Sequence, residues 1–374
     1  MKTIGILGLG SMGKIIAKDL AETYNRKVIY LARDVNSVKN LAKKNNAEIR
    51  YADVSKPKTL AKAFKNIDVV IHAVHHEFNL NVMKACLKSK TNYIDLGGLY
   101  HYTKKQLKLN KQFKKNNLTA ILGIGASPGI TNVMAKYASR FLNKIESIEI
   151  KIGFKDFSTY KQISPLSASY SIQTILEEFS WKPAIFVNGK IKFVEPISGR
   201  EEYNFPEPIG MQKPQYTIHS EIATLPYTLK AKNVSFKIAF DDEFVNKIKM
   251  LKENGFISDE KIKINNNEFN IKEVSAEILK KLPKTISEKI NQYEIIRVIL
   301  SNKHKKIIMD AKISGETIDK DTGVPPSIIA QMIVDGKITN KGVFPPESII
   351  LEEDFFKELA KRRIYIYQNN KKIN

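Results

Sequence analysis

The chain has 374 residues, 43% of them hydrophobic and 27% charged, with a formal net charge of +22; this balance is typical of a globular protein of two or three domains. The single cysteine, Cys86, excludes an internal disulfide framework and a cysteine-rich zinc site. Because the sequence has neither an apolar run of 18 residues nor a signal-like N-terminus, we expect a cytoplasmic protein with no membrane partner.

The first 125 residues alternate short β-rich runs with amphipathic helical patterns. Continuous runs of Val and Ile separated by helices predict a parallel sheet covered on both faces, which is the doubly wound α/β pattern. The expected strands cover residues 3–8, 27–32, 47–52, 68–74, 92–97 and 118–123, and the expected helices cover residues 13–24, 78–89 and 103–117.

A glycine-rich loop, Gly8-Leu9-Gly10-Ser11-Met12-Gly13, stands between the first predicted strand and the first predicted helix. Gly8 allows a tight turn, Gly10 lets the backbone approach a pyrophosphate, and Gly13 permits close packing of helix on strand. The helix start supplies amide donors and a partial positive charge. This G-x-G-x-x-G therefore predicts dinucleotide binding by Gly8, Gly10, Ser11, Met12 and Gly13.

The end of the second predicted strand bears on the choice of cofactor. Ala32 occupies the position where an acidic residue would bind the ribose 2′-hydroxyl of NAD, and Arg33, which follows it, suits the 2′-phosphate of NADP. Asp34 stands one or two positions late, where it binds the cofactor or caps the next helix instead. The sequence predicts NAD or NADP, with NADP slightly favoured by Arg33.

The fourth predicted strand ends in a run of histidines next to the expected cofactor crevice. Since the carboxyl ends of parallel strands border that crevice, Val74 and His75 are candidates for contact with the cofactor. His75 and His76 also look like a metal pair. Adjacent side chains point in different directions, however, and no third ligand stands at a motif spacing, so we expect no metal.

The fifth predicted strand ends at the same crevice with Asp95, Gly97 and Gly98. The two glycines would allow a nicotinamide or substrate to approach closely. A tight turn before the next helix explains them equally well.

The most basic stretch covers residues 103–117, where lysines alternate with Leu107, Leu109 and Phe113. That spacing is typical of an amphipathic helix with a solvated lysine face. The other lysines are spread over the whole chain instead of forming one patch. We therefore expect no nucleic-acid partner, despite the positive charge.

After residue 130 the pattern changes to strands paired by hairpins and followed by helices. This change predicts an α+β second domain on an open antiparallel or mixed sheet, with Asn188-Gly189 as a two-residue hairpin turn. The expected elements are a helix over 130–142, a strand over 147–154, a helix over 167–181, a hairpin over 183–196, strands over 215–220 and 233–240, and a Pro-opened helix over 322–338.

Two groups in the second part suggest chemistry. A strand over 216–221 would place His219 and Glu221 on one face with Ser220 opposite, and such a pair can hold an amine or relay a proton. Arg200 suits a substrate carboxylate, which it would bind through a bidentate fork. A buried His–Glu pair and an exposed Arg–Glu pair remain equally open interpretations.

A second glycine loop, LGIGASPGITN at residues 122–132, precedes the predicted helix over 130–142. Pro128 fixes a backbone angle and removes an amide donor, so this loop differs from the first. We expect it at the crossing between domains, where Ser127, Pro128 and the helix N-terminus face the cleft. They would meet a substrate carboxylate or the nicotinamide end of the cofactor.

The chain resembles the saccharopine dehydrogenase-like oxidoreductases, and among them the lysine 6-dehydrogenases, along almost its whole length. The blocks that carry the resemblance are GLGSMG, FNLNVMKAC, NYIDLGGLY, GASPGITN, SPLSASYSIQTILEEF, SGREEYNFPEPIG, YTIHSEIATLP and TGVPPSIIAQM. The resemblance implies a Rossmann domain over 1–128, completed by a tail from about 325 to 374. It also implies a substrate-binding and dimerisation domain over 129–324, and therefore a homodimer.

The resemblance further implies hydride transfer between a nicotinamide and a carbon bearing nitrogen. We expect oxidative deamination of an amino-acid substrate, L-lysine, at its ε-carbon to 2-aminoadipate 6-semialdehyde. His219 would act as the base, helped by Glu221 or Asp95. The residues expected to bind the substrate are Arg200, Ser127, Asn132, Tyr170 and Thr174.

Two alternatives stay open. A saccharopine-type C–N oxidoreductase would need a pocket for two extra carboxylates, with more arginines near the cleft. A catalytically silent NAD(P)-binding sensor or scaffold would keep the GLGSMG loop and tolerate the loss of the polar residues of the second domain.

Overall fold

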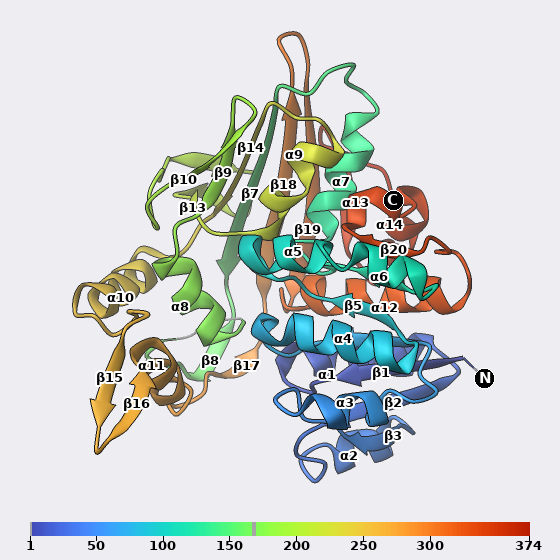
Figure 1. Cartoon of the computed structure of the whole chain (residues 1–374). Helices are drawn as coiled ribbons and strands as arrows, with labels where there is room; N and C mark the ends of the chain where they lie inside the picture. The colour runs from blue at the N-terminus through green and yellow to red at the C-terminus, as the bar shows by residue number, and fades with distance from the viewer. Residues whose placement is uncertain (1, 167–169) are drawn as a thin grey trace.

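The fold is known from a computed structural model, which describes residues 2–166 and 170–374. Residues 167–169, the first part of the helix expected over 167–181, lie outside the described residues. Figure 1 shows a lower sheet near the N-terminus, a taller sheet above it, and a lobe of helices and short strands to one side. No helix among the described residues is long and apolar enough to cross a membrane.

The first sheet has seven parallel strands in the order β20-β6-β5-β4-β1-β2-β3, the order of a doubly wound dinucleotide fold. Successive residues of the central strand β4 enter different apolar clusters, Val69 and Ile71 on one face and Val70 on the other, so both faces are buried. The strands are β1 (Thr3–Leu7), β2 (Lys27–Ala32), β3 (Glu48–Tyr51), β4 (Val69–His72), β5 (Asn92–Asp95), β6 (Thr119–Ile121) and β20 (Gly342–Phe344).

Helices cover both faces of this sheet, as the Val- and Ile-rich strands require. They are α1 (Ser11–Thr23), α2 (Lys39–Lys44), α3 (Pro57–Ala63), α4 (Asn79–Ser89), α5 (Leu99–Leu107), α6 (Asn110–Lys115) and α12 (Lys320–Val334), with a short 3-10 turn, η1 (His76–Phe78), before α4. The predicted lysine helix over 103–117 is wrong as one element. The chain breaks after Leu107 because the Asn110 side chain accepts a hydrogen bond from the Val343 amide at 2.8 Å, which ties the start of α6 to β20.

The second sheet is mixed, as the hairpin pattern predicts: β14 runs parallel to β7, and its other pairs are antiparallel. The turn at Asn188 and Gly189 has φ angles of 52° and 79°, which confirms the expected hairpin. Its strands are β7 (Ser147–Asp156), β9 (Ala184–Val187), β10 (Lys190–Phe193), β13 (Gln215–Tyr216), β14 (Asn233–Ile238), β18 (Gln292–Ser301), β19 (Lys306–Glu316), β21 (Tyr365–Gln368) and β22 (Lys371–Lys372).

A lobe beside the second sheet packs apolar faces of α8, α10 and α11 against one another (Figure 1). The remaining elements are α7 (Ile130–Ser139), β8 (Thr159–Gln162), α8 (Ile172–Ser180), β11 (Tyr203–Phe205), β12 (Gly210–Gln212), η2 (Ser220–Ala223), α9 (Leu225–Thr228), α10 (Asp242–Glu253), β15 (Lys261–Ile264), β16 (Asn267–Asn270), α11 (Ile271–Leu279), β17 (Ile286–Lys289), α13 (Pro346–Ile349) and α14 (Glu352–Lys361).

Two elements near the site differ from expectation. The strand expected over 215–220 ends at Tyr216, and residues 220–223 form the turn η2, because the Glu221 side chain turns inward to bond residues that precede and begin α7. The helix expected over 322–338 begins earlier, at Lys320, and holds Pro325 and Pro326 inside it.

The segment after residue 325 contributes to both sheets. Helix α12 packs against α1, where a Cβ on Gly323 would lie 2.5 Å from Ile15, and β20 extends the first sheet beside β6. The last strands, β21 and β22, belong to the second sheet instead, since β21 pairs with β19. A tail that only completed the first domain would stay with the first sheet. This segment instead adds β20 to the first sheet and β21 to the second.

Candidate active site

The first glycine loop has the three properties that dinucleotide binding requires. Gly8 has a φ of 93°, and a Cβ on Gly13 would lie 1.9 Å from the Gly8 carbonyl oxygen. A Cβ on Gly10 would meet no atom of residues 2–166 and 170–374 within 4 Å, so this side of the loop is open to a ligand. Ser11 and Met12 begin α1 just after Gly10, which gives the helix no side-chain cap. The loop therefore offers free amides and a helix N-terminus to a pyrophosphate.

The residues that follow β4 pack against this loop, and the glycines that follow β5 pack against other side chains. A Cβ on Gly8 would lie 2.5 Å from Val74, which places Val74 against the glycine loop. Gly97 has a φ of 134°, and a Cβ there would lie 3.1 Å from Pro128. A Cβ on Gly98 would lie 2.6 Å from the Gln106 side chain. Gly97 and Gly98 thus make room for neighbouring side chains, which accounts for both without a ligand.

Asp95 is a buried acceptor that holds the strand ends together. Its carboxylate accepts hydrogen bonds from Gln106 at 2.5 Å, from the Tyr93 hydroxyl at 2.9 Å, and from the amides of Gly97 and Gly123 at 3.0 and 2.7 Å. Burial raises its pKa, against these bonds. Because four donors occupy the two oxygens, we assign Asp95 a positioning role in place of the expected proton transfer.

His219 and Glu221 form the centre of a buried polar group. The His219 Nδ1 atom lies 2.5 Å from Glu221 Oε2. The other carboxylate oxygen accepts bonds from the hydroxyls of Ser127 at 2.5 Å and Thr131 at 2.8 Å. The His219 ring also stacks on Phe236, with centroids 3.8 Å apart. Four contacts therefore fix one histidine and one carboxylate in a single arrangement.

This group lies at the carboxyl ends of the first sheet. Ser127 follows β6, and Ser220, between the histidine and the glutamate, stands 3.7 Å from the Cβ position of Gly97 after β5. The expected pairing of His219 with Glu221 is present, although the chain reaches it through an extended residue and a 3-10 turn instead of a strand. The carboxyl ends of parallel strands are where ligands of such sheets bind.

Charge determines the protonation of this pair. Burial alone would lower the pKa of His219, but the nearby carboxylates of Glu221 and Glu178 outweigh it and raise the pKa. Burial alone would raise the pKa of Glu221, but His219 and the two hydroxyl donors lower it. The two shifts agree, and they favour an imidazolium paired with a carboxylate.

Further carboxyl groups continue from His219 toward the start of α12. Burial raises the pKa of Glu178 to about 7, and Glu178 accepts a bond from the Tyr170 hydroxyl at 2.5 Å. Glu294 lies next along this line: its charge acts on Tyr170, and burial together with Asp321 raises its own pKa well above the usual value. Burial also raises the pKa of Asp319 to about 7 and that of Asp321 to about 6.

The end of this acidic group at Asp321 lies beside the 122–132 loop, whose Ser127 and Thr131 bond Glu221. Asp321 is 3% exposed, and the next residue, Thr322, lies 3.3 Å from the Cβ position of Gly125. Of the acidic set Glu178, Glu294, Asp319 and Asp321, the first and last are buried, and Glu294 and Asp319 are half-buried. Carboxyl groups gathered away from water favour a cationic ligand.

Family models match both parts of the chain. Residues 4–121 match the saccharopine dehydrogenase NADP binding domain, and residues 125–364 match the saccharopine dehydrogenase C-terminal domain. The chain belongs to the saccharopine dehydrogenase family. This membership and the α/β fold class confirm the resemblance to the saccharopine dehydrogenase-like oxidoreductases, and they make the protein an NAD(P)-dependent oxidoreductase; the narrower resemblance to lysine 6-dehydrogenases stays a prediction.

Proteins similar to this chain carry the names of several different enzymes. Carboxynorspermidine synthase of Vibrio alginolyticus is 23% identical over 92% of this chain and 91% of its own length, and carboxyaminopropylagmatine dehydrogenase of Synechocystis is 23% identical over 93% of each. Carboxynorspermidine synthase of Vibrio cholerae is 24% identical over 68% of this chain and 66% of its own length. Apo saccharopine dehydrogenase (L-Glu forming) from Saccharomyces cerevisiae shares the fold, with a TM-score of 0.73 over both whole chains at 18% identity.

Several side chains expected to bind substrate have other partners in this saccharopine dehydrogenase family member. Arg200 is bonded to Asp242, and Lys213 stands 3.9 Å from the same carboxylate. Asn132 caps α7 by accepting from the Gly129 amide at 3.0 Å, and its amide nitrogen donates to Glu347 at 2.8 Å. These bonds leave the expected carboxylate-binding roles of Arg200 and Asn132 without support.

Of the other residues expected to bind substrate, Ser127 and Tyr170 lie in the site and Thr174 lies at its edge. Ser127 bonds Glu221 and Tyr170 bonds Glu178, so both belong to the polar group. Thr174 lies in the first turn of α8, where its amide bonds the capping Ser171 side chain at 3.4 Å. Sequence reasoning missed the acidic set. Its one local signal is the Glu177-Glu178 doublet within the apolar helix α8.

Arg33 and Asp34 follow β2, and the Asp34 carboxylate already accepts local hydrogen bonds. Asp34 accepts hydrogen bonds from the amides of Asn36 at 3.0 Å and Ser37 at 3.3 Å, which makes it a local turn acceptor before α2. Arg33 is exposed next to it. This arrangement favours recognition of a 2′-phosphate by Arg33 over recognition of a ribose hydroxyl by Asp34.

We expect Arg33→Ala to raise the KM for NADP by about 10- to 100-fold, the loss that follows from removing charge-assisted hydrogen bonds. The KM for NAD should change little, because NAD has no 2′-phosphate. Steady-state kinetics with both cofactors measures the ratio. Arg363→Ala, which removes another exposed arginine, is the control, and an unchanged cofactor ratio in Arg33→Ala would contradict the assignment.

Proposed function

We propose that the protein oxidises or reduces a C–N bond in an amino acid that carries a distal cationic amine, with a carboxylated amine such as carboxynorspermidine as its preferred substrate. The observation that carries the proposal is the acidic set, which continues from the His219–Glu221 pair toward the start of α12. The names of the relatives support it, since carboxynorspermidine and carboxyaminopropylagmatine both denote carboxylated amines. The proposal includes a cytoplasmic homodimer.

The bound dinucleotide supplies or accepts the hydride in this chemistry. In the oxidative direction the substrate nitrogen must lose its proton first, and neutral His219 accepts it. Glu221 stabilises the imidazolium that results, while Ser127 and Thr131 hold Glu221 in place. In the reductive direction the imidazolium returns that proton to nitrogen. The acidic set holds the distal ammonium, so the carbon next to nitrogen is presented in one orientation.

Oxidative deamination of L-lysine is the second candidate. Lysine also joins an amino-acid head to a distal ammonium, which the acidic set accepts. Saccharopine suits the site less well, because it adds carboxylates and Arg200 is bonded to Asp242.

The test measures reduced-nicotinamide absorbance with NADP and NAD in the presence of carboxynorspermidine, L-lysine or saccharopine. We expect the highest kcat/KM with carboxynorspermidine. Turnover of lysine alone would replace the proposal by the second candidate. Turnover of no amine, with NADPH still bound, would favour the silent sensor.

Glu294→Gln examines the contribution of the acidic set, with the same carboxyl-to-amide change at the exposed Glu288 as the control. We expect Glu294→Gln to raise the KM for the cationic substrate roughly 10-fold, the size of one charge-assisted contact. Glu288→Gln should leave it unchanged. Equal KM values in the two variants would contradict binding of the ammonium by this set.

A further inference from the structure

A histidine pair and a glutamate meet between the first sheet and the lobe. His75 and His76 follow β4, and Glu177 lies on α8. The Glu177 Oε2 atom stands 3.4 Å from the Nε2 atom of His75 and 2.9 Å from the Nε2 atom of His76. One ligand atom from each of the three side chains lies within 4.8 Å of the other two. The fold thus supplies the third ligand that no motif spacing offers.

The polar atoms of this group are buried, and several of them have no well-aligned hydrogen bond. The side chains of His75, His76 and Glu177 are 11%, 7% and 7% exposed. Among the described residues, both ring nitrogens of His75, the Nε2 atom of His76 and the Oε2 atom of Glu177 have no well-formed hydrogen bond, although the last two atoms lie 2.9 Å apart. Buried polar atoms are nearly always paired with protein, water or an ion, so the group calls for a ligand.

The geometry is that of a transition-metal site. Zinc holds imidazole nitrogens and carboxylate oxygens at about 2.0–2.2 Å in a tetrahedron, which places neighbouring ligand atoms roughly 3.3–3.6 Å apart. The separation of 3.4 Å between His75 and Glu177 matches that edge, and the 2.9 Å between His76 and Glu177 is shorter than it. Glu77 Oε1 lies 3.8 Å from His75 Nδ1, on the side where a second carboxylate orients a ligating imidazole.

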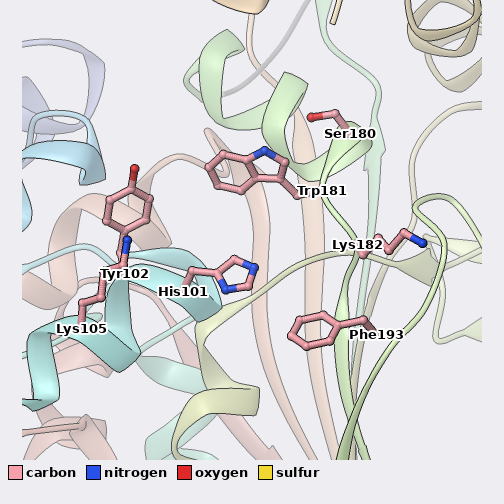
Figure 2. Close-up of a pocket in the computed structure, with 7 residues that line it drawn as sticks. All are labelled: His101, Tyr102, Lys105, Ser180, Trp181, Lys182 and Phe193. Atoms are coloured by element: carbon pink, nitrogen blue, oxygen red, sulfur yellow. The ribbon is translucent and has the colours of Figure 1, made fainter. Parts of the chain in front are cut away.

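A cavity of about 620 Å³ borders the group. Tyr102 lines it, and the Tyr102 ring centroid is 4.9 Å from that of His76. Trp181, which also lines it, follows Glu177 by one helical turn. Figure 2 shows His101, Tyr102 and Lys105 on one side of this cavity and Trp181 and Phe193 on the other.

We propose that His75, His76 and Glu177 bind one divalent transition-metal ion, zinc by its donor chemistry, which bridges the first domain and the lobe of the second. Two imidazoles and one carboxylate leave a fourth position open to water or to a ligand in the bordering cavity. Because Val74 contacts the glycine loop, the ion stands beside the dinucleotide site and fixes the lobe against it. This inference does not depend on the substrate proposed above.

The experiment titrates the chelator-treated full chain with Co²⁺, followed by visible absorption, and with Zn²⁺, followed by calorimetry. We expect one ion per chain with a Kd of about 1 µM or tighter. Zn²⁺ should also raise the Tm, since its ligands come from both domains. Because the readouts are spectroscopic and thermal, they do not depend on which substrate the enzyme turns over.

Glu177→Gln and His76→Ala should each weaken binding by roughly 100-fold or more and abolish the rise in Tm, because each removes a direct ligand. His304→Ala, which removes an exposed histidine, should bind as the wild type does. If either variant fails to fold by circular dichroism, His75→Ala takes its place. A wild-type Kd above about 1 mM, or tight binding that survives all three ligand substitutions, overturns the proposal in favour of a metal-free histidine–carboxylate contact.

Discussion

His219→Ala is expected to lower kcat/KM by roughly 10²- to 10⁴-fold, the usual contribution of a positioned general acid or base. His219 is the imidazole held by Glu221 at 2.5 Å and by its stack on Phe236, so no other group takes up its position. Steady-state kinetics with the preferred amine measures the loss. Glu221→Gln should cost a similar factor, because residues that act as a unit are not additive, and the double variant should be little worse than either single one.

The pH dependence separates this role from a structural one. Glu221 and Glu178 raise the pKa of His219, and oxidation needs neutral imidazole, so kcat/KM should rise with pH through that raised pKa. Removing the negative charge in Glu221→Gln lowers the pKa of His219. The acid limb of the profile should therefore move to lower pH.

NADPH binding and the Tm of each variant serve as controls, because the glycine loop is unchanged. If His219→Ala kept turnover within a few-fold of wild type, the base would lie elsewhere. An acid limb that did not move in Glu221→Gln would remove Glu221 from the pairing.

Gly13→Ala is expected to unfold or severely destabilise the first domain, in contrast to Gly10→Ala. The new methyl of Gly13→Ala would lie 1.9 Å from the Gly8 carbonyl oxygen, which is backbone and cannot turn away. Overpacking of this kind costs about 1–3 kcal/mol or more. Alanine would otherwise favour a helix by about 1 kcal/mol, so a net loss of stability reports the clash. Thermal denaturation measures it.

Gly10→Ala is the matched control for folding. Its methyl meets no atom within 4 Å in the described part of the chain, so the Tm should stay close to that of the wild type. The same open space is where a pyrophosphate would approach, and we expect NADPH binding, followed by fluorescence, to weaken by about 10-fold or more. A Gly10→Ala variant with wild-type affinity would show that the dinucleotide does not use this loop.

Local patterns predicted the parts of the fold that depend on near neighbours. The six N-terminal strands, the Asn188-Gly189 turn and the pairing of His219 with Glu221 all follow from spacings of a few residues. The acidic set could not be predicted in this way. Glu178, Glu294 and Asp321 lie on α8, β18 and α12, and only the tertiary fold places them near one another.

The same limit explains the corrections. The sequence shows that Arg200 can bind a carboxylate, but the partner it meets is Asp242 on α10. Likewise Asp95 has the chemistry of a base. Only the fold shows that its oxygens already accept hydrogen bonds from Gln106 and from the Gly123 amide. Residue type gives the chemistry a side chain is capable of. Its distant neighbours decide which part of that chemistry is used.

The position of β20 has a consequence for synthesis on the ribosome. This strand pairs with β6, and the Thr119 hydroxyl bonds the Asn340 carbonyl at 2.5 Å, yet about 220 residues separate the two strands along the chain. At roughly 5–20 residues per second, the nascent first domain waits about 10–45 s with the edge of β6 open. Since β21 then joins the second sheet, neither sheet is complete before the C-terminal segment leaves the ribosome. Both sheets are therefore completed late, by the same C-terminal segment.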